Sequence, residues 1–226
     1  MDCRPGTIPY NPPAEAWQIR DHGRRRQRHA RGCASPNTPT IALSMLTEIA
    51  PPAFDIDLEL LYATADNLSG VPIYRSAVCL LHPDAARRLT DAIRLARGIG
   101  CRLRVYDAFR PTEAQWRLWQ AFPDPTYIAD PRLGSNHSRG VAIDLTLADA
   151  AGVPLDMGTG FDEMTERSHH GRSDLTAKQQ RNRAKLLGVM VAAGWEHYPS
   201  EWWHYQLPDA ESYPLLTDAA AGGRLM

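Results

Sequence analysis

The feature that most constrains the fold is an apolar segment, VAIDLTL at residues 141–147, with a carboxylate at its centre. In a strand, alternate side chains share a face. The four aliphatic side chains at odd positions therefore face the core, and Asp144 lies on the opposite face. A carboxylate in the middle of a strand is costly to bury unless it is paired or bound to a metal. The segment thus predicts a buried strand whose acidic side chain has a specific partner.

Three other segments predict further strands. They are FDIDLELLYA at 54–63, which alternates at first, CRLRVYDAF at 101–109, and a strand pair that contains EWWHYQL at 201–207. Strands and helices are mixed along the chain, without a regular βαβ repeat. The pattern predicts a single α+β domain, in which helices pack beside an antiparallel sheet.

Helix-start signals separate these strands. One helix is expected to open at His82-Pro83-Asp84, because proline is favoured in a first helical turn, and to stop at Gly98 and Gly100. Thr112 with Gln115 has the spacing of a capping box and predicts a short helix. Thr176 with Gln179 has the same spacing and predicts a longer one.

Composition divides the chain at about residue 45. Residues 1–44 contain seven arginines and three acidic side chains, whereas residues 45–226 carry 18 basic and 23 acidic side chains. The whole chain is 43% hydrophobic with a net charge of −1. It has no run of about 18 apolar residues. Nothing global therefore indicates a nucleic-acid or membrane partner, and residues 45–226 are expected to form the folded domain.

The first 44 residues hold six prolines and an RRRQR cluster. We expect them to be a disordered basic extension, or to precede the true start of translation at Met45. A short nucleic-acid-binding arm is the alternative for a basic tail. A secretory signal needs an apolar region after its basic residues, and HARGCASPNTPTIA does not supply one. The expected location is therefore cytoplasmic.

Two segments offer metal ligands. Gly140, just before the central strand, would let the preceding loop fold back and bring His137 over Asp144. In EWWHY, Glu201 and His204 are three residues apart, so a straight strand would point them to opposite faces. The segment must bend or bulge if these two side chains are to converge.

Together these residues supply two imidazoles, one carboxylate and one additional glutamate. Three protein ligands leave a fourth position for water, which is the pattern of a catalytic zinc site. Zinc lowers the pKa of such a water to about 7, and Glu201 is the candidate that takes its proton. Arg110, fixed by Pro111 in YDAFRP, is the candidate that stabilises an oxyanion.

Each residue alone has a simpler interpretation. An isolated His137 or His204 is more commonly a core or surface histidine, and an isolated Asp144 caps a turn or pairs with an arginine. Arg110 would ordinarily form a surface salt bridge. The zinc hydrolase interpretation depends on three separated segments that supply complementary parts of one mechanism.

The combination of YDAFRP, SNHSRGVAIDLTL and EWWH closely resembles the D-alanyl-D-alanine dipeptidases of the VanX type. The resemblance extends in the same order over residues 54–217, through ADNLSG, CLLHPDA, LWQAFPDP, DMGTGFDEM, ERSHH, QRNR and SYPLL. These enzymes share a zinc superfamily with D-Ala-D-Ala carboxypeptidases, lysostaphin-like endopeptidases and the hedgehog signalling domain. The implied fold is the single α+β domain of that superfamily.

The resemblance implies one zinc ion per chain, held by His137, Asp144 and His204. It implies that Glu201 is the general base and acid, and that Arg110 stabilises the transition state. The implied reaction is hydrolysis of D-alanyl-D-alanine to two D-alanines.

Two substrate contacts are also implied. Ser135 is expected to hold one terminus of the dipeptide, and Asp162, in GFDEM, to anchor its free ammonium. Recognition of both termini would explain why such an enzyme cuts a dipeptide and spares longer peptides. The adjacent His169 and His170 lie in a polar loop and are expected to be solvated rather than to bind a second metal.

Two alternatives stay open. One is a D,D- or L,D-carboxypeptidase of the same superfamily that acts on peptidoglycan and would need export. The other is a non-catalytic zinc or cell-wall binding module, which would have no need of Glu201 and Arg110. The sequence leaves undecided the oligomeric state, the range of dipeptides accepted, and a role in D-alanine recycling or in vancomycin resistance.

Overall fold

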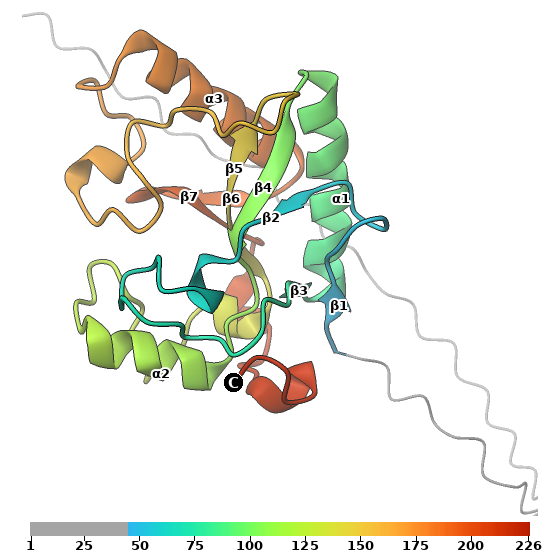
Figure 1. Cartoon of the computed structure of the whole chain (residues 1–226), viewed down its shortest axis with the longest axis vertical. Helices are drawn as coiled ribbons and strands as arrows, with labels where there is room; N and C mark the ends of the chain where they lie inside the picture. Colours follow the sequence, from blue (N-terminus) through green and yellow to red (C-terminus); the bar gives the residue numbers. More distant parts are fainter. Residues whose placement is uncertain (1–44) are drawn as a thin grey trace, which may run out of the picture. The chain divides into compact units, whose positions relative to one another are not determined.

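The structure is a computed structural model that describes residues 45–226. The predicted basic extension, residues 1–44, lies outside the described residues. In the described part, five strands form one sheet in the order β2-β4-β5-β7-β6, and β1 pairs with β3 separately. The elements (Figure 1) are β1 (Thr47–Glu48), β2 (Asp57–Leu58), β3 (Leu80–Leu81), α1 (Pro83–Gly98), β4 (Arg102–Asp107), α2 (Thr112–Ala121), β5 (Ala142–Ala148), α3 (Ala177–Ala192), β6 (Glu196–Tyr198) and β7 (Glu201–Gln206). The predicted α+β class is confirmed.

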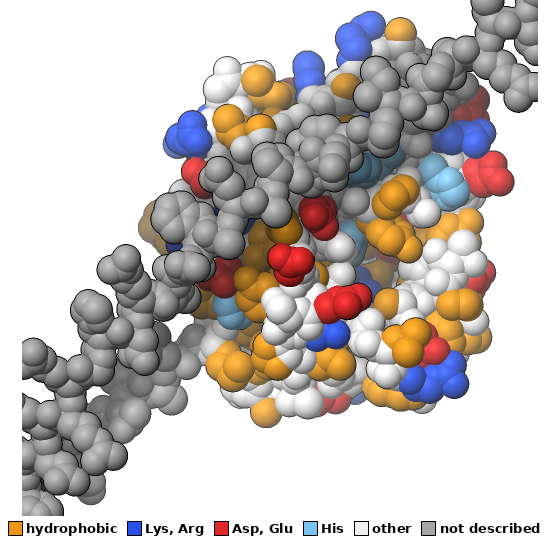
Figure 2. All heavy atoms as spheres, turned by 180° about the vertical axis from the view of Figure 1, so that it is seen from behind, with side chains coloured by type: hydrophobic (Ala, Val, Ile, Leu, Met, Phe, Trp, Pro, Cys, Tyr) orange, Lys and Arg blue, Asp and Glu red, His pale blue; other side chains and the backbone are white. Residues whose placement is uncertain are grey.

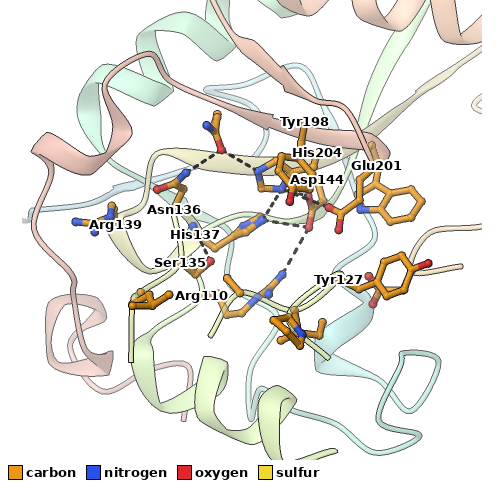
Figure 3. A pocket seen from close by; sticks show the side chains of 18 of the residues that line it. Arg110, Tyr127, Ser135, Asn136, His137, Arg139, Asp144, Tyr198, Glu201 and His204 are labelled. Atoms are coloured by element: carbon orange, nitrogen blue, oxygen red, sulfur yellow. Dashed lines mark hydrogen bonds and ion pairs between the residues drawn. The ribbon is translucent and has the colours of Figure 1, made fainter. Parts of the chain in front are cut away.

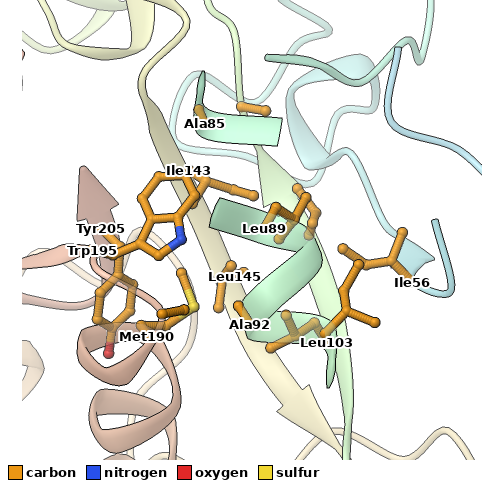
Figure 4. Close-up of a cluster of buried hydrophobic side chains, with 14 of the residues drawn as sticks. Ile56, Ala85, Leu89, Ala92, Leu103, Ile143, Leu145, Met190, Trp195 and Tyr205 are labelled. Atoms are coloured by element: carbon orange, nitrogen blue, oxygen red, sulfur yellow. The ribbon is translucent and has the colours of Figure 1, made fainter. Parts of the chain in front are cut away.

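The predicted central strand is β5, which lies between β4 and β7. All seven of its residues are buried, so both of its faces are covered. Figure 4 shows one of these faces, where Ile143 and Leu145 lie among apolar side chains of α1 and α3. The labelled neighbours are Ala85, Leu89 and Ala92 of α1, Met190 of α3, and Trp195, which lies just before β6. Asp144 faces the other way, toward the pocket described below.

The sheet differs from the prediction at its β2 edge. Only Asp57–Leu58 of the predicted strand 54–63 is a strand, and it runs parallel to β4, whereas the other neighbouring strands are antiparallel. Residues Leu61–Ala63 instead form a 3-10 helix that buries Tyr62. The alternation of polar and apolar residues ends at Leu60, and the apolar run that follows has no period of two to support a strand.

The two predicted capping boxes had different outcomes. The box at the start of α3 is confirmed, because the side chains of Thr176 and Gln179 each bond to the other's backbone N–H. The prediction of a capping box at the start of α2 is wrong, because no side chain of the described residues caps that helix. Gln115 accepts a hydrogen bond from Arg110 (3.2 Å) and donates one to the Ala129 carbonyl (2.7 Å). A buried guanidinium needs an acceptor more than an exposed helix end needs a cap.

The surface of the described residues carries charges of both signs. On the face shown in Figure 2, the coloured acidic and basic side chains are interspersed with apolar ones. No single-sign basic stripe of the kind that binds nucleic acid lies there. Within residues 45–226, no helix combines the length and the apolar character that a membrane crossing requires.

We expect a protein whose translation starts at Met45 to keep the melting temperature of the full chain and the activity that the sequence predicts. The physical reason is that the two hydrophobic clusters of the described part are built from residues between Leu46 and Leu225. Thermal denaturation and kcat/KM of both proteins, measured side by side, test this. A lower melting temperature in the shorter protein would show that residues 1–44 contribute to folding.

Candidate metal centre and active site

The strand register aligns three acidic or imidazole side chains across the middle of the sheet. Asp144 on β5 is the Cα partner of Asp107 on β4 and of His204 on β7. His204 Nδ1 lies 3.1 Å from Asp144 Oδ1. Because the side chains of directly opposed residues lie on the same face, this contact follows from the register alone.

His137 reaches the same point from the turn before β5. It lies in a 3-10 turn, His137–Arg139, that ends at Gly140 in the left-handed conformation (φ 70°). A side chain at Gly140 would also come within 2.9 Å of Leu46 and 3.1 Å of the His82 backbone nitrogen. The predicted fold-back is confirmed, since His137 Nε2 lies 3.3 Å from Asp144 Oδ2 (Figure 3).

Outer hydrogen bonds fix which nitrogen of each imidazole faces inward. His137 Nδ1–H donates to the Ala108 carbonyl (2.7 Å), which leaves Nε2 unprotonated. His204 Nε2–H donates to Gln206 Oε1 (3.3 Å), which leaves Nδ1 unprotonated. Gln206 is held in turn by Asn136, which donates to the same oxygen (2.8 Å). Such outer partners orient metal-ligating histidines in known sites.

When both imidazoles are neutral, the nitrogens that face the pocket and the Asp144 carboxylate are all hydrogen-bond acceptors, and none of them has a proton to donate to the others. His137 Nε2 and His204 Nδ1 are 3.1 Å apart, and one ligand atom from each of the three residues lies within 4.8 Å of the others. When the two imidazoles are protonated, their charge and hydrogen bonds outweigh the effect of burial and hold the pKa of Asp144 well below its ordinary value. When they are neutral, they offer Asp144 no donor. Lone pairs and a carboxylate in such proximity repel one another unless a cation lies between them. Two imidazoles and one carboxylate suit Zn²⁺.

Glu201 joins the site through an irregularity in β7. Tyr198 pairs with Glu201 and His197 pairs with Tyr205, so the three residues between them on β7 have no partner on β6. This is the bend that the EWWHY spacing required, and it brings Glu201 Oε2 to 3.9 Å from His204 Nδ1. Burial, followed by the nearby carboxylates, raises the pKa of Glu201 to about 8. A divalent cation at the three ligands would lower that pKa.

Arg110 lies beside the same ligands, held in one orientation. Its Nε donates to Asp107 Oδ2 (2.9 Å), its Nη2 forms an ion pair with the same oxygen (2.8 Å), and its Nη1 donates to Gln115. The guanidinium also covers the ring of Tyr62, with 4.8 Å between its carbon and the ring centroid. Nη2 remains 3.6 Å from Asp144 Oδ2. A cation fixed in this way suits an oxyanion that forms beside the metal ligands.

The pocket that contains these groups also contains the two expected substrate contacts. It has a volume of about 280 Å³, and Ser135 and Asp162 both line it. Ser135 is buried, and its hydroxyl accepts a hydrogen bond from the His137 backbone N–H (3.3 Å). Asp162 accepts one from the Tyr62 hydroxyl (2.8 Å), and burial raises the pKa of Asp162 to about 7. Every predicted site residue therefore lines one pocket.

Several contributing residues were absent from the predicted site. Tyr62 lies in a stretch that was predicted to be a strand, and Gln115 was interpreted as a helix cap. Asp107 had a visible signal, because it precedes Arg110 by three residues in YDAFRP. Gln206 had none, since an amide at the end of a strand has no distinctive pattern.

The adjacent histidines were not interpreted correctly. His170 is half-buried, and its ring contacts that of His197 edge-on, with 5.0 Å between the centroids. Burial lowers the pKa of His170 to about 4. The expectation of a solvated pair is therefore wrong for His170. Among the described residues, the metal-ligand group that forms is the one at His137, Asp144 and His204.

The fold and the site together define a class, the hydrolases that use a metal held by histidines and a carboxylate beside a glutamate. A family model described as D-ala-D-ala dipeptidase matches residues 42–219. The D-alanyl-D-alanine dipeptidase of Escherichia coli (strain K12) is 54% identical over 164 residues, which cover 73% of this chain and 85% of that protein. That of Enterococcus faecium is 36% identical over 177 residues, covering 68% and 86%. The chain belongs to the D-alanyl-D-alanine dipeptidase family and is a peptidase, as its sequence predicted.

We predict that Gln206→Leu weakens zinc binding about 10- to 100-fold, the usual effect of removing an outer partner of a ligating histidine. Without Gln206, His204 Nε2–H has no protein acceptor to hold Nδ1 toward Asp144. Competition with a chromogenic chelator measures the affinity, and the exposed Gln120→Leu serves as a matched control. Equal zinc affinity in both variants would show that the orientation of His204 does not depend on Gln206.

Proposed function

We propose that this protein hydrolyses the dipeptide D-alanyl-D-alanine to two D-alanines, with one zinc ion per chain at His137, Asp144 and His204. The observation that carries the proposal is the convergence of three acceptor groups and Glu201 in one buried pocket, in a chain that belongs to the dipeptidase family. Zinc in such a site supplies a Lewis acid, lowers the pKa of a bound water to about 7 and depresses the pKa of a nearby carboxyl group.

Glu201 is the proposed general base and acid. It is buried, lies 3.9 Å from His204, and is not held by an arginine or lysine ion pair among the described residues. It therefore accepts the proton of the attacking water and passes it to the leaving amine. Arg110 stabilises the oxyanion of the tetrahedral state, and Asp107 keeps its guanidinium in place.

The pocket suits a substrate with two charged ends. Its volume of about 280 Å³ is at the small end of ligand pockets, which typically start at about 300 Å³. Asp162 binds the free ammonium, and Ser135 contributes a hydroxyl to one terminus of the substrate. An acylated amine would place an uncharged, larger group against Asp162, so a longer peptide is disfavoured both sterically and electrostatically. The cytoplasmic location expected from the sequence stays a prediction.

We expect Glu201→Gln to retain zinc and to lower kcat by about 10²- to 10⁴-fold, the contribution usual for a general acid–base group. The amide keeps the size of the side chain but cannot take a proton. Metal analysis and D-alanine release are measured together, with the exposed Glu196→Gln as the control. Unchanged hydrolysis in the Glu201 variant would remove Glu201 from the mechanism.

Substrate choice tests the reaction itself. The zinc-loaded protein is expected to release D-alanine from D-Ala-D-Ala, and to leave intact both L-Ala-L-Ala and a pentapeptide that ends in D-Ala-D-Ala. The pentapeptide lacks a free ammonium next to the scissile bond for Asp162 to bind, and L-Ala-L-Ala has the opposite configuration at both α-carbons. Cleavage of the pentapeptide instead would favour the carboxypeptidase alternative. Absence of cleavage with zinc bound would overturn the proposed reaction.

A further inference from the structure

Arg183 of α3 is a buried cation that belongs to none of the groups described so far. Its guanidinium donates to three backbone carbonyls: Nε to Met157 (2.7 Å), Nη1 to His169 (2.8 Å) and Nη2 to Arg167 (2.8 Å). A weaker contact joins Nη2 to Thr159 Oγ1 (3.4 Å). The side chain is 5% exposed, and no carboxylate lies within ion-pair distance among the described residues.

These acceptors lie on both sides of Asp162 in the sequence. We call residues 156–170 the Asp162 loop. They are part of the connection between β5 and α3, which runs beside α3 in Figure 1. Met157 and Thr159 precede Asp162, whereas Arg167 and His169 follow it. One side chain therefore ties the two limbs of the loop together. These hydrogen bonds hold the two ends of the segment that carries Asp162 in fixed positions relative to each other.

The backbone at Asp162 needs such support. Asp162 has a φ of 57°, in the left-handed region that a residue with a side chain rarely occupies. Unfavourable backbone conformations persist where the surrounding structure enforces them. The carboxylate has one side-chain hydrogen bond, from Tyr62. The course of the loop therefore decides where the carboxylate lies in the pocket.

An arginine has the shape that this task requires. Its planar group presents five N–H donors in fixed directions, so it can reach carbonyls on two separate limbs, which a lysine ammonium on its flexible stem does less well. Burial, followed by the charge of Arg167, lowers the pKa of Arg183 to about 10, so the group is still a cation at neutral pH. Further bonds to the loop include those from Asn182 to the Asp156 carbonyl, from Gln179 to the Asp156 carboxylate, and from Trp202 Nε1 to Thr159.

We propose that Arg183 is a positioning residue that sets the place of Asp162 and thereby the preference of the enzyme for a free substrate ammonium. The inference deepens the proposed function, because it rests on the role of Asp162 given there. It assigns a task to the QRNR segment, which no part of the catalytic site explains. Arg183 itself does not touch the reacting atoms.

The experiment compares Arg183→Lys and Arg183→Met with the control Arg181→Lys, an exposed arginine on the same helix. Two quantities are measured in zinc-loaded full-length protein. One is KM for D-Ala-D-Ala, and the other is the inhibition constant of N-propanoyl-D-alanine, which lacks only the ammonium. The ratio of the inhibition constant to KM reports ammonium recognition separately from the rest of binding.

We expect both Arg183 variants to raise KM about tenfold or more, since a displacement of about 1 Å can cost up to about 100-fold. The inhibition constant and kcat should change little, so the ratio falls, and Arg181→Lys should leave it unchanged. Asp162→Asn should lower the same ratio. If Arg183 acts through Asp162, adding Arg183→Lys to Asp162→Asn lowers the ratio no further.

Each other outcome has a distinct meaning. An unchanged ratio in Asp162→Asn would overturn the proposed role of Asp162. A lowered ratio there with unchanged ratios in the Arg183 variants would overturn the inference about Arg183. Parallel rises in KM and the inhibition constant, or additive effects in the double variant, would show a general structural role instead. Should neither Arg183 variant fold, Thr159→Val, which removes a loop acceptor shared by Arg183 and Trp202, carries the same test.

Discussion

The register of three central strands is the constraint on which the site depends. Because Asp107, Asp144 and His204 are Cα partners across β4, β5 and β7, their side chains lie in one row on one face of the sheet. The opposite face of β5 is packed against α1 and α3. A slip of one residue would exchange the two faces, burying Asp144 in the apolar core and exposing aliphatic side chains to the pocket. The hydrophobic packing of the helices thus fixes the position of the Asp144 carboxylate.

This alignment places several acidic side chains close together in a buried part of the protein. The charge of Asp107 is balanced by Arg110, which it holds through one hydrogen bond and a close ion pair. Asp144 faces two imidazole lone pairs and has no comparable partner of its own, since Arg110 is 3.6 Å away. Glu201 adds a carboxyl group whose pKa burial raises to about 8. A divalent cation held by His137, Asp144 and His204 would compensate these groups together, and its binding would then be coupled to the stability of this region.

Residues whose chemistry is expensive to bury were predictable from the sequence. Asp144 in an apolar strand, and Glu201 and His204 among aromatic residues, each require a specific partner, and the spacing in EWWHY required the bend that β7 shows. Tyr62 and Gln206 were not predictable, because their roles arise from contacts between distant segments: Tyr62 touches Asp162, and Asn136 holds the Gln206 amide that accepts from His204. The Gln115 side chain fitted a local capping pattern, but a buried guanidinium five residues earlier attracted it instead. Local patterns fail where a tertiary contact offers a stronger interaction.

The site therefore combines two kinds of support that differ in rigidity. Asp144 and His204 are held by hydrogen-bonded central strands, and His137 by a tight turn with no room for a side chain at Gly140. Asp162 lies instead on the long connection between β5 and α3, in an unfavourable backbone conformation. Its position depends on side chains of α3 and β7 that bind the loop at residues other than Asp162. Strands resist displacement because each residue shares its hydrogen bonds with two neighbours, whereas a loop moves when a single clamp is lost. Substitutions in the connection between β5 and α3 should accordingly leave the metal affinity unchanged, even where they alter the selectivity of the pocket for a free over an acylated substrate amine.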